Sequence, residues 1–311
     1  MININDRTVF CTGEIVLDII FRNNAPVAAR PGGSMLNTAI SLGRAGVNVR
    51  FIGETGCDKI SEMVLNFLEE HHVGTSFITR RPESKTTVAL AFLDNSGDAT
   101  YSFYPSGSEQ RFDSGLPNPD ENDILLFGSF FSLSGRIREM LVPFLSRARE
   151  NRALIVYDPN FRKPHRHLLT KVLPFINENI SMSDVVRGSD EDFIHIFAAG
   201  NAEQVFTMIH DPGRRTLVYT QNSNGVRILK TGMNLRVPVP KIDPVSTIGA
   251  GDAFNAGMIH SILKMGIRKD DLDSAGPETW KEIAETGIRF STDVCMSLDN
   301  YISEKFSTSL K

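Results

Sequence analysis

The stretch ILLFGSFFSLSGRIREMLVPFLSRARENRALIVYD, residues 124–158, decides the fold class of this chain. Its ends, 124–127 and 153–157, are short apolar runs typical of buried strands, and 135–149 between them has the apolar spacing of a helix. Two strands joined in this way predict a parallel pair with a crossover helix. A chain that repeats the unit is expected to form a parallel sheet covered by helices on both faces.

The same alternation continues on both sides of this stretch. We expect further strands at 8–13, 47–52, 76–79, 184–187 and 216–220, and further helices at 34–45, after Asp58, and at 167–179, 190–198, 201–210, 249–265 and 277–298. The apolar runs at 226–229 and 235–239 predict a hairpin. The fold class is therefore α/β, with three layers, α/β/α, and a central, mostly parallel sheet.

A second pair of runs, 86–93 and 99–104, interrupts the alternation because no helix lies between them. They predict a hairpin outside the main sheet, joined by the polar turn 95–98. Together with the segment from Ile20 to Arg30 it predicts a small β lid. We expect one domain over 1–311, with lid segments at about 19–31 and 84–105.

The composition favours an enzyme or binding protein for small molecules. The 311 residues include 33 Lys plus Arg and 37 Asp plus Glu, so the net charge is −4, and no block of like charge suits nucleic acid or an acidic membrane. The longest apolar stretch, Ile124 to Leu133, is too short to cross a bilayer. Cys11, Cys57 and Cys295 lack the spacing of a metal or redox pair, and the N-terminus lacks a signal peptide. We expect a cytoplasmic protein with reduced thiols and no protein-bound metal site.

The segment DPVSTIGAGDAFNAG, residues 243–257, carries the strongest chemical signal. Gly249, Ala250 and Gly251 begin a predicted helix, where uncovered N–H groups and the helix dipole suit an anion. Asp252 in the first turn is suited to act as a general base for a hydroxyl that attacks phosphorus. The alternative is that Asp252 caps the helix and the glycines permit close packing.

A second group of polar residues follows the first strand. Asp18, Gly32, Gly33 and Asn37 are expected beyond the carboxyl end of that strand, where parallel sheets bind ligands. A carboxylate, an amide and bare backbone are suited to a polyol. The alternative is a simple turn at Gly32-Gly33, with Asp18 in solvent and Asn37 within a helix.

Two later strand ends carry weaker signals. Asp158-Pro159-Asn160-Phe161-Arg162 follows one strand, and Arg162 can hold a phosphate by charge-assisted hydrogen bonds. Thr220 to Gly225 follows another and supplies a hydroxyl and a glycine. An ordinary turn and an ordinary hairpin loop are the alternatives.

Taken in order, these segments resemble the ribokinase-like sugar kinases of the PfkB family, most closely the fructokinase branch, from Gly13 to about Ile302. The resemblance implies a ribokinase-like fold, ATP and Mg²⁺ as cofactors, and Asp252 as the catalytic base beside an anion hole at Gly249, Ala250 and Gly251, with Arg162 on the phosphates. It implies sugar ligands at Asp18, Gly32, Gly33, Asn37 and Asn160. Thr220, Gly225 and Asp192 are the implied nucleotide-side residues.

The implied function is transfer of the γ-phosphate of ATP to a primary hydroxyl of a monosaccharide, with fructose first. A 2-keto-3-deoxygluconate kinase and a ribokinase are the alternatives within the family. A non-catalytic sensor of sugar or nucleotide is the alternative from another class, and a nicotinamide oxidoreductase is third. Sugar and ATP are the expected partners, without nucleic acid or membrane, and the apolar lid positions Val88, Leu90 and Phe92 can pair into a homodimer.

Four segments of the sequence depart from the family pattern. Met35-Leu36 stands where the family usually has Pro-Ala, which is expected to alter the sugar pocket. Ser246 replaces an aspartate that helps hold a monovalent cation in many relatives. Ser189 and Asp192 replace an asparagine and a glutamate linked to magnesium and phosphate, and Asn222 replaces a frequent glycine. The departures at Ser246, Ser189 and Asn222 support the sensor alternative.

Overall fold

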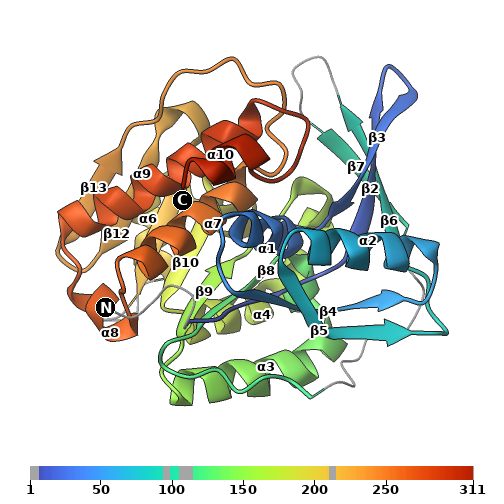
Figure 1. Ribbon diagram of the computed structural model, residues 1–311. Coiled ribbons are helices and arrows are strands. Elements are labelled where there is room, and N and C mark those ends of the chain that lie inside the picture. Colours follow the sequence, from blue (N-terminus) through green and yellow to red (C-terminus); the bar gives the residue numbers. More distant parts are fainter. Residues whose placement is uncertain (1–6, 94–98, 105–114, 210–214, 311) are drawn as a thin grey trace.

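A nine-stranded sheet forms the centre of the molecule (Figure 1). The computed structural model describes residues 7–93, 99–104, 115–209 and 215–310. The strands lie in the order β13-β12-β11-β10-β9-β8-β1-β4-β5. Their bounds are β1 Val9–Thr12, β4 Val49–Gly56, β5 Val73–Arg81, β8 Ile124–Gly128, β9 Leu154–Asp158, β10 Val185–Ser189, β11 Thr216–Thr220, β12 Val226–Lys230 and β13 Met233–Val237. Neighbours from β5 to β11 are parallel, whereas β12 and β13 add on antiparallel, so the prediction of a mostly parallel sheet is confirmed.

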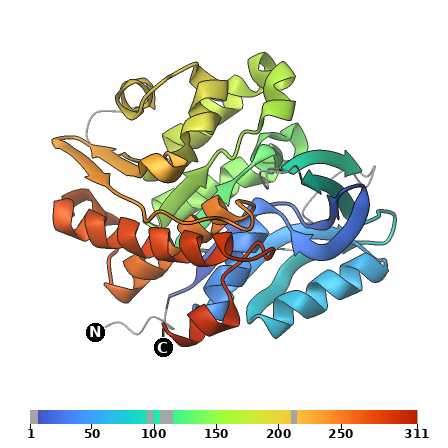
Figure 2. The same ribbon diagram turned by 90° about the horizontal axis from the view of Figure 1, so that it is seen from above.

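Helices cover both faces of this sheet, which produces three layers (Figure 2). On one face the core includes side chains of α1 Ser34–Arg44, α2 Lys59–Glu70, α7 Ala250–Lys264 and α9 Pro277–Cys295. On the other it includes side chains of α3 Gly135–Glu150, α4 Leu169–Met182, α5 Asp190–Phe197 and α6 Ala202–Ile209. The short helices α8 Lys269–Ser274 and α10 Glu304–Thr308 were not expected from the sequence. No described helix is long and apolar enough to span a membrane.

A second sheet of four strands, in the order β3-β2-β6-β7, stands beside the main one (Figure 1). Its strands are β2 Val16–Arg22, β3 Ala25–Gly32, β6 Thr87–Leu93 and β7 Ala99–Tyr104. The buried face of this small sheet packs Ile20, Ala91 and Leu93 against Ile248 and Leu298, next to the start of α7. The lid expected from the hairpin pattern is therefore present as a separate sheet, although its predicted turn at 95–98 lies outside the described residues.

The first two strands of the small sheet, β2 and β3, begin earlier and end later than the predicted lid segment 19–31, whereas β6 and β7 lie within the predicted segment 84–105. β2 pairs in parallel with β6 and antiparallel with β3, so Asp18 and Gly32 lie within strands and not in a loop after β1. The β2–β6 pairing joins segments about 70 residues apart, and a local sequence pattern does not predict which distant strand is the partner. This correction moves Asp18 onto the lid itself.

The sheet order reverses at β1. From β1 the chain builds β4 and β5 on one side, and the later strands from β8 onward on the other. In doubly wound sheets, ligands bind beyond the carboxyl ends of the strands at such a reversal. Asp158 and Thr220 are the last residues of β9 and β11, and α7 begins at the same edge, since Gly251 in its first turn lies against Arg187 of β10.

Candidate active site

The carboxylate of Asp252 points toward α1 and not toward the end of its own helix. Its Oδ1 accepts a hydrogen bond from Ser34 Oγ at 2.6 Å, and its Oδ2 accepts one from Asn37 Nδ2 at 2.9 Å. Thr38 Oγ1 donates to the Asp252 carbonyl oxygen at 3.0 Å, which joins the first turns of the two helices. No side chain caps α7, so the alternative that Asp252 is a helix cap is wrong.

The environment makes Asp252 a stronger base than a carboxylate in water. Burial raises the pKa of Asp252, the hydrogen bonds from Ser34 and Asn37 lower it, and the nearby charge of Asp158 raises it, with a net upward direction. Only 8% of the residue is exposed. A raised pKa brings a carboxylate closer to the range in which it accepts a proton effectively near neutral pH.

The first turn of α7 presents backbone N–H groups without partners. Gly249 has φ 77°, and a Cβ there would lie 2.4 Å from the carbonyl oxygen of Asn300, so only glycine fits. The Ala250 N–H bonds Thr247 O at 3.3 Å. Within the described residues the N–H groups of Gly251 and Asp252 have no acceptor, and the helix dipole adds positive potential there. The turn can therefore hold an anion next to the Asp252 carboxylate.

Asp18 lies on the buried face of the small sheet. Asn300 Nδ2 donates to Asp18 Oδ2 at 3.4 Å, and a Cβ on Gly32 would overlap that oxygen at 2.1 Å. Burial, with the charges of Glu14 and Asp252, raises the pKa of Asp18 to about 7. The residue is 7% exposed, so the alternative of a solvated Asp18 is wrong.

The glycine pair connects the small sheet to α1. Gly32 ends β3, and Gly33 is the N-cap of α1. Gly33 has φ 120°, and a Cβ there would lie 2.4 Å from the carbonyl oxygen of Glu14. This geometry sets the position of α1, which carries the Ser34 and Asn37 side chains that hold Asp252.

Asp158 joins the end of β9 to two other elements. Its Oδ2 accepts from Arg187 Nη1 at 2.8 Å and from Asn255 Nδ2 at 2.6 Å, and its Oδ1 accepts from the Asn160 N–H at 3.0 Å. Arg187 Nη2 donates to Thr220 Oγ1 at 3.0 Å, which reaches the end of β11. The expected residues Asn160 and Thr220 are therefore linked to α7 through Asp158 and Arg187.

Arg162 and Asp192 bring opposite charges to the same region. Desolvation lowers the pKa of the Arg162 guanidinium, but the charges of Asp192, Asp252 and Asp158 raise it, with a net upward direction. Asp192 is buried, and its Oδ2 accepts from the N–H and the hydroxyl of Ser189 in a capping box. Its Oδ1 is buried without a hydrogen-bond partner among the described residues.

Gly225 is an expected site residue for which the described contacts do not reach Asp252 or Asp158. It lies in the turn after β11 with φ 101°, and its described contacts are with its own hairpin and the end of β13. Asn222 in the same turn has φ 46°, a left-handed conformation that glycine also favours.

Two departures from the family pattern have a structural role. Met35 and Leu36 are buried in the hydrophobic core, and the expectation that they alter the sugar pocket stays a prediction. Ser246 is buried, and its Oγ accepts from the Ile248 N–H at 3.2 Å, which shapes the turn before α7.

Several residues near the site were missed by the sequence analysis. Ser34, Arg187, Asn255 and Asn300 all bond the expected acidic residues. The small sheet adds Tyr101, whose pKa is raised by burial and by the charges of Asp18 and Asp252. A charged residue inside an apolar strand was a usable signal for Arg187. Nothing local marks Asn300 or Tyr101, because their partners are distant in sequence.

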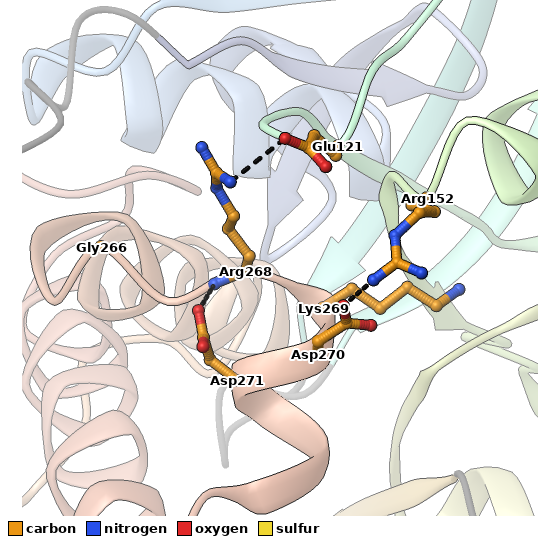
Figure 3. A pocket seen from close by; sticks show the side chains of 7 residues that line it. All are labelled: Glu121, Arg152, Gly266, Arg268, Lys269, Asp270 and Asp271. Atoms are coloured by element: carbon orange, nitrogen blue, oxygen red, sulfur yellow. Dashed lines mark hydrogen bonds and ion pairs between the residues drawn. The ribbon is translucent and has the colours of Figure 1, made fainter.

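A charged pocket lies at the opposite edge of the sheet (Figure 3). It has a volume of about 420 Å³ and is lined by Glu121, Arg152, Gly266, Arg268, Lys269, Asp270 and Asp271. Arg268 pairs with Glu121, Arg152 with Asp270, and Lys269 with Asp184. Each of the three cations that line the pocket therefore already has a carboxylate partner.

The chain is similar to known proteins over most of its length. The family model described as pfkB family carbohydrate kinase matches residues 6–284. A fructokinase of Rhizobium leguminosarum bv. trifolii is 31% identical over 269 residues, covering 83% of this chain and 80% of the relative. A fructokinase of Vibrio alginolyticus is 26% identical over 254 residues, covering 81% of this chain and 82% of the relative.

Two solved structures show the same fold. The fructokinase of Vibrio cholerae O395, in a form with fructose, ADP and calcium ion bound, has a TM-score of 0.84 at 18% identity, covering 97% of this chain and 98% of that one. The aminoimidazole riboside kinase of Salmonella enterica, complexed with aminoimidazole riboside and an ATP analog, has a TM-score of 0.80 at 18% identity, covering 98% and 100%.

Proposed function

The chain belongs to the pfkB family of carbohydrate kinases, and from this premise we propose that it transfers the γ-phosphate of ATP to a primary hydroxyl of fructose. Fructose is favoured because the relative at 31% identity is a fructokinase. The observation that carries the proposal is the Asp252 carboxylate, held by Ser34 and Asn37 beside N–H groups that have no acceptor.

In this proposal Asp252 accepts the hydroxyl proton as the sugar oxygen attacks the γ-phosphorus in line. Ser34 and Asn37 fix the direction of the carboxylate, so the base needs little reorientation during the reaction. The N–H groups of the Gly249 to Asp252 turn, together with Arg162, stabilise the negative oxygens of the transferred group. Exclusion of water by the small sheet, acting as a lid on a single catalytic domain, prevents hydrolysis of ATP.

The sugar would be held by Asp18, Asn37 and Asn160, with close backbone approach at Gly32 and Gly33. The amide oxygens of Asn37, Asn160 and Asn300 are all buried without a hydrogen-bond partner among the described residues. Unpartnered buried acceptors are costly, and sugar hydroxyls are the donors that would satisfy them. The Asp18 carboxylate adds a stronger acceptor on the lid side.

Thr220 and Gly225 are proposed to contact ATP, and Asp192 to hold Mg²⁺. Asp192 fits this role because its Oδ1 is buried and unpartnered, and carboxylate oxygens are preferred magnesium ligands. Bound magnesium would neutralise charge on the phosphates. The cytoplasm, as the source of ATP, is the proposed compartment, and the three free thiols are consistent with it.

We also propose a homodimer formed through the outer face of the small sheet. Phe92 is 38% exposed and stacks on Phe21 at 5.0 Å, and Val88 and Leu90 lie beside it on the same face. Light scattering after size exclusion is expected to give a dimer for the wild type and a monomer for Phe92→Asp. Met208→Asp changes an apolar residue on α6 that is more exposed, at 57%, and is expected to remain dimeric. A monomeric wild type would contradict this proposal.

A coupled ADP-release assay over a panel of sugars tests the function. The panel contains fructose, 2-keto-3-deoxygluconate, ribose, a nucleoside and glucose, each with Mg²⁺ and ATP. We expect fructose to give the highest kcat/KM. Preference for another sugar would correct the substrate, whereas sugar or ATP binding by calorimetry without turnover would favour the sensor alternative.

A further inference from the structure

The guanidinium of Arg187 connects three elements beneath the start of α7. Arg187 lies on β10 and is 5% exposed. Nη1 donates to Asp158 on β9, and Nη2 donates to Thr220 on β11. Its Cζ lies 5.5 Å from the ring centre of Phe254 on α7. A single buried cation therefore spans the ends of two strands and contacts the helix above them.

The same guanidinium lies directly against Gly251. A Cβ on Gly251 would be 2.8 Å from Nη1, 3.0 Å from Nη2 and 3.3 Å from Cζ. Gly251 is the second residue of α7, and its N–H is one of the two without an acceptor. The absence of a side chain at this position thus allows the arginine to support the turn from below.

Asp158 completes the link to α7. The oxygen that accepts from Arg187 also accepts from Asn255, which lies one turn after Asp252. Arg187 therefore reaches the helix both by direct contact at Gly251 and through the Asp158–Asn255 hydrogen bond. A lysine has one ammonium group on a flexible stem, and it cannot reproduce a planar fork that serves two acceptors in fixed directions.

We propose that Arg187 is a positioning residue for phosphoryl transfer. It fixes the first turn of α7, and with it the N–H groups and the Asp252 carboxylate, relative to the sugar-side end of β9 and the nucleotide-side end of β11. This inference rests on the proposed role of that turn. A buried ion pair that served stability alone would contribute to folding without controlling the rate of the chemical step.

Kinetics of Arg187→Lys test the proposal, because lysine keeps the charge beside Asp158. The measurements are kcat and KM for the preferred sugar and for ATP, with circular dichroism to confirm folding. We expect kcat to fall by about 10- to 100-fold, since small misplacement of catalytic groups has effects of that size, and KM for the sugar to change little.

Arg138→Lys is the matched control. Arg138 is also a buried arginine with a forked contact, to Asn179 and Glu178, but it lies on α3 in the other helix layer. We expect Arg138→Lys to lower the thermal midpoint while kcat per folded molecule is unchanged. Wild-type kcat in folded Arg187→Lys, or an equal loss of kcat in both variants, would overturn the proposal.

A double-mutant cycle tests the contact without using activity. Gly251→Ala is expected to lower the thermal midpoint in the wild type, and to lower it less in Arg187→Met, where all three guanidinium atoms near the new Cβ are absent. Equal effects in the two backgrounds would overturn the contact. If the wild type phosphorylates no sugar, the proposed function fails, and the cycle still decides whether Arg187 supports the turn.

Discussion

Replacing Asp18 by Asn is predicted to stabilise the free protein at alkaline pH while it weakens sugar binding. Burial, Glu14 and Asp252 raise the pKa of Asp18 from 3.8 to about 7. Such a carboxyl group is held in an environment that disfavours its charge. Asn removes the charge, and its amide can still pair with Asn300, which donates to Asp18 at 3.4 Å.

The size of the stability change follows from the linkage between folding and proton binding at Asp18. Below about pH 3 Asp18 is protonated in both the folded and the unfolded chain, so it causes no difference in stability. Between pH 4 and about 7 only the unfolded chain loses the proton, and the wild type loses stability as the pH rises. Above pH 7 the loss reaches about 4 kcal/mol, at 1.36 kcal/mol for each pKa unit. For a chain of 311 residues this is a shift of about 6 °C in the thermal midpoint.

Differential scanning calorimetry of the free protein at pH 4.5 and pH 8.5 measures this directly. We expect Asp18→Asn to have a midpoint above that of the wild type at pH 8.5 and close to it at pH 4.5, with a raised KM for the sugar. Glu203→Gln is a control of opposite sign, because hydrogen bonds from Asn234 and Arg227 lower the pKa of Glu203. It should reduce stability at pH 8.5 and not at low pH. A midpoint difference for Asp18→Asn that is independent of pH would refute the reasoning.

Two further substitutions test the supports of the site. Gly33→Ala is expected to cost about 1 to 3 kcal/mol of stability and much of kcat, because its Cβ would meet the Glu14 carbonyl at 2.4 Å and displace α1. Gly46 also has a positive φ, 80°, but a Cβ there would meet no atom within 4 Å, so Gly46→Ala should lower the thermal midpoint slightly and leave kcat unchanged. Asp192→Asn is expected to raise the Mg²⁺ concentration for half-maximal rate by about tenfold or more, as measured by magnesium titration at fixed ATP. An unchanged titration would remove Asp192 from the metal site.

The fold could be predicted where an element has a clear apolar pattern in its own sequence. The strands β8 and β9 and the helix α3 each follow from their own apolar spacing, and their observed bounds lie within one or two residues of the predicted ones. β2 was missed as a strand because Asp18 interrupts its apolar run, and β3 contains Pro26 and Pro31. β2 is stabilised by pairing with β6, and β3 by pairing with β2, and a local pattern cannot reveal the distant partner β6.

The candidate site could also be predicted only where the local sequence carries a signal. Gly249, Asp252 and Asn37 were predicted from small residues and polar groups at element ends. The hydrogen bond between Asn37 and Asp252 spans 215 positions in the chain, so the sequence alone did not show that the two side chains meet. The charge of Arg187 within an apolar strand was a usable signal, but only the fold reveals its partners Asp158 and Thr220. Asn300 has no motif of its own, and only the fold brings it to Asp18.

Turnover of Asp252→Asn is the measurement that tests the central claim most directly. An asparagine can place its amide oxygen toward Asn37 and its amide nitrogen toward Ser34, so folding and ATP binding should be retained. We predict that kcat falls by about 10² to 10⁴, the usual effect of removing a general base. Asp271→Asn, at the opposite edge of the sheet, should leave kcat unchanged. Turnover of Asp252→Asn close to that of the wild type would contradict the assignment of Asp252 as the base.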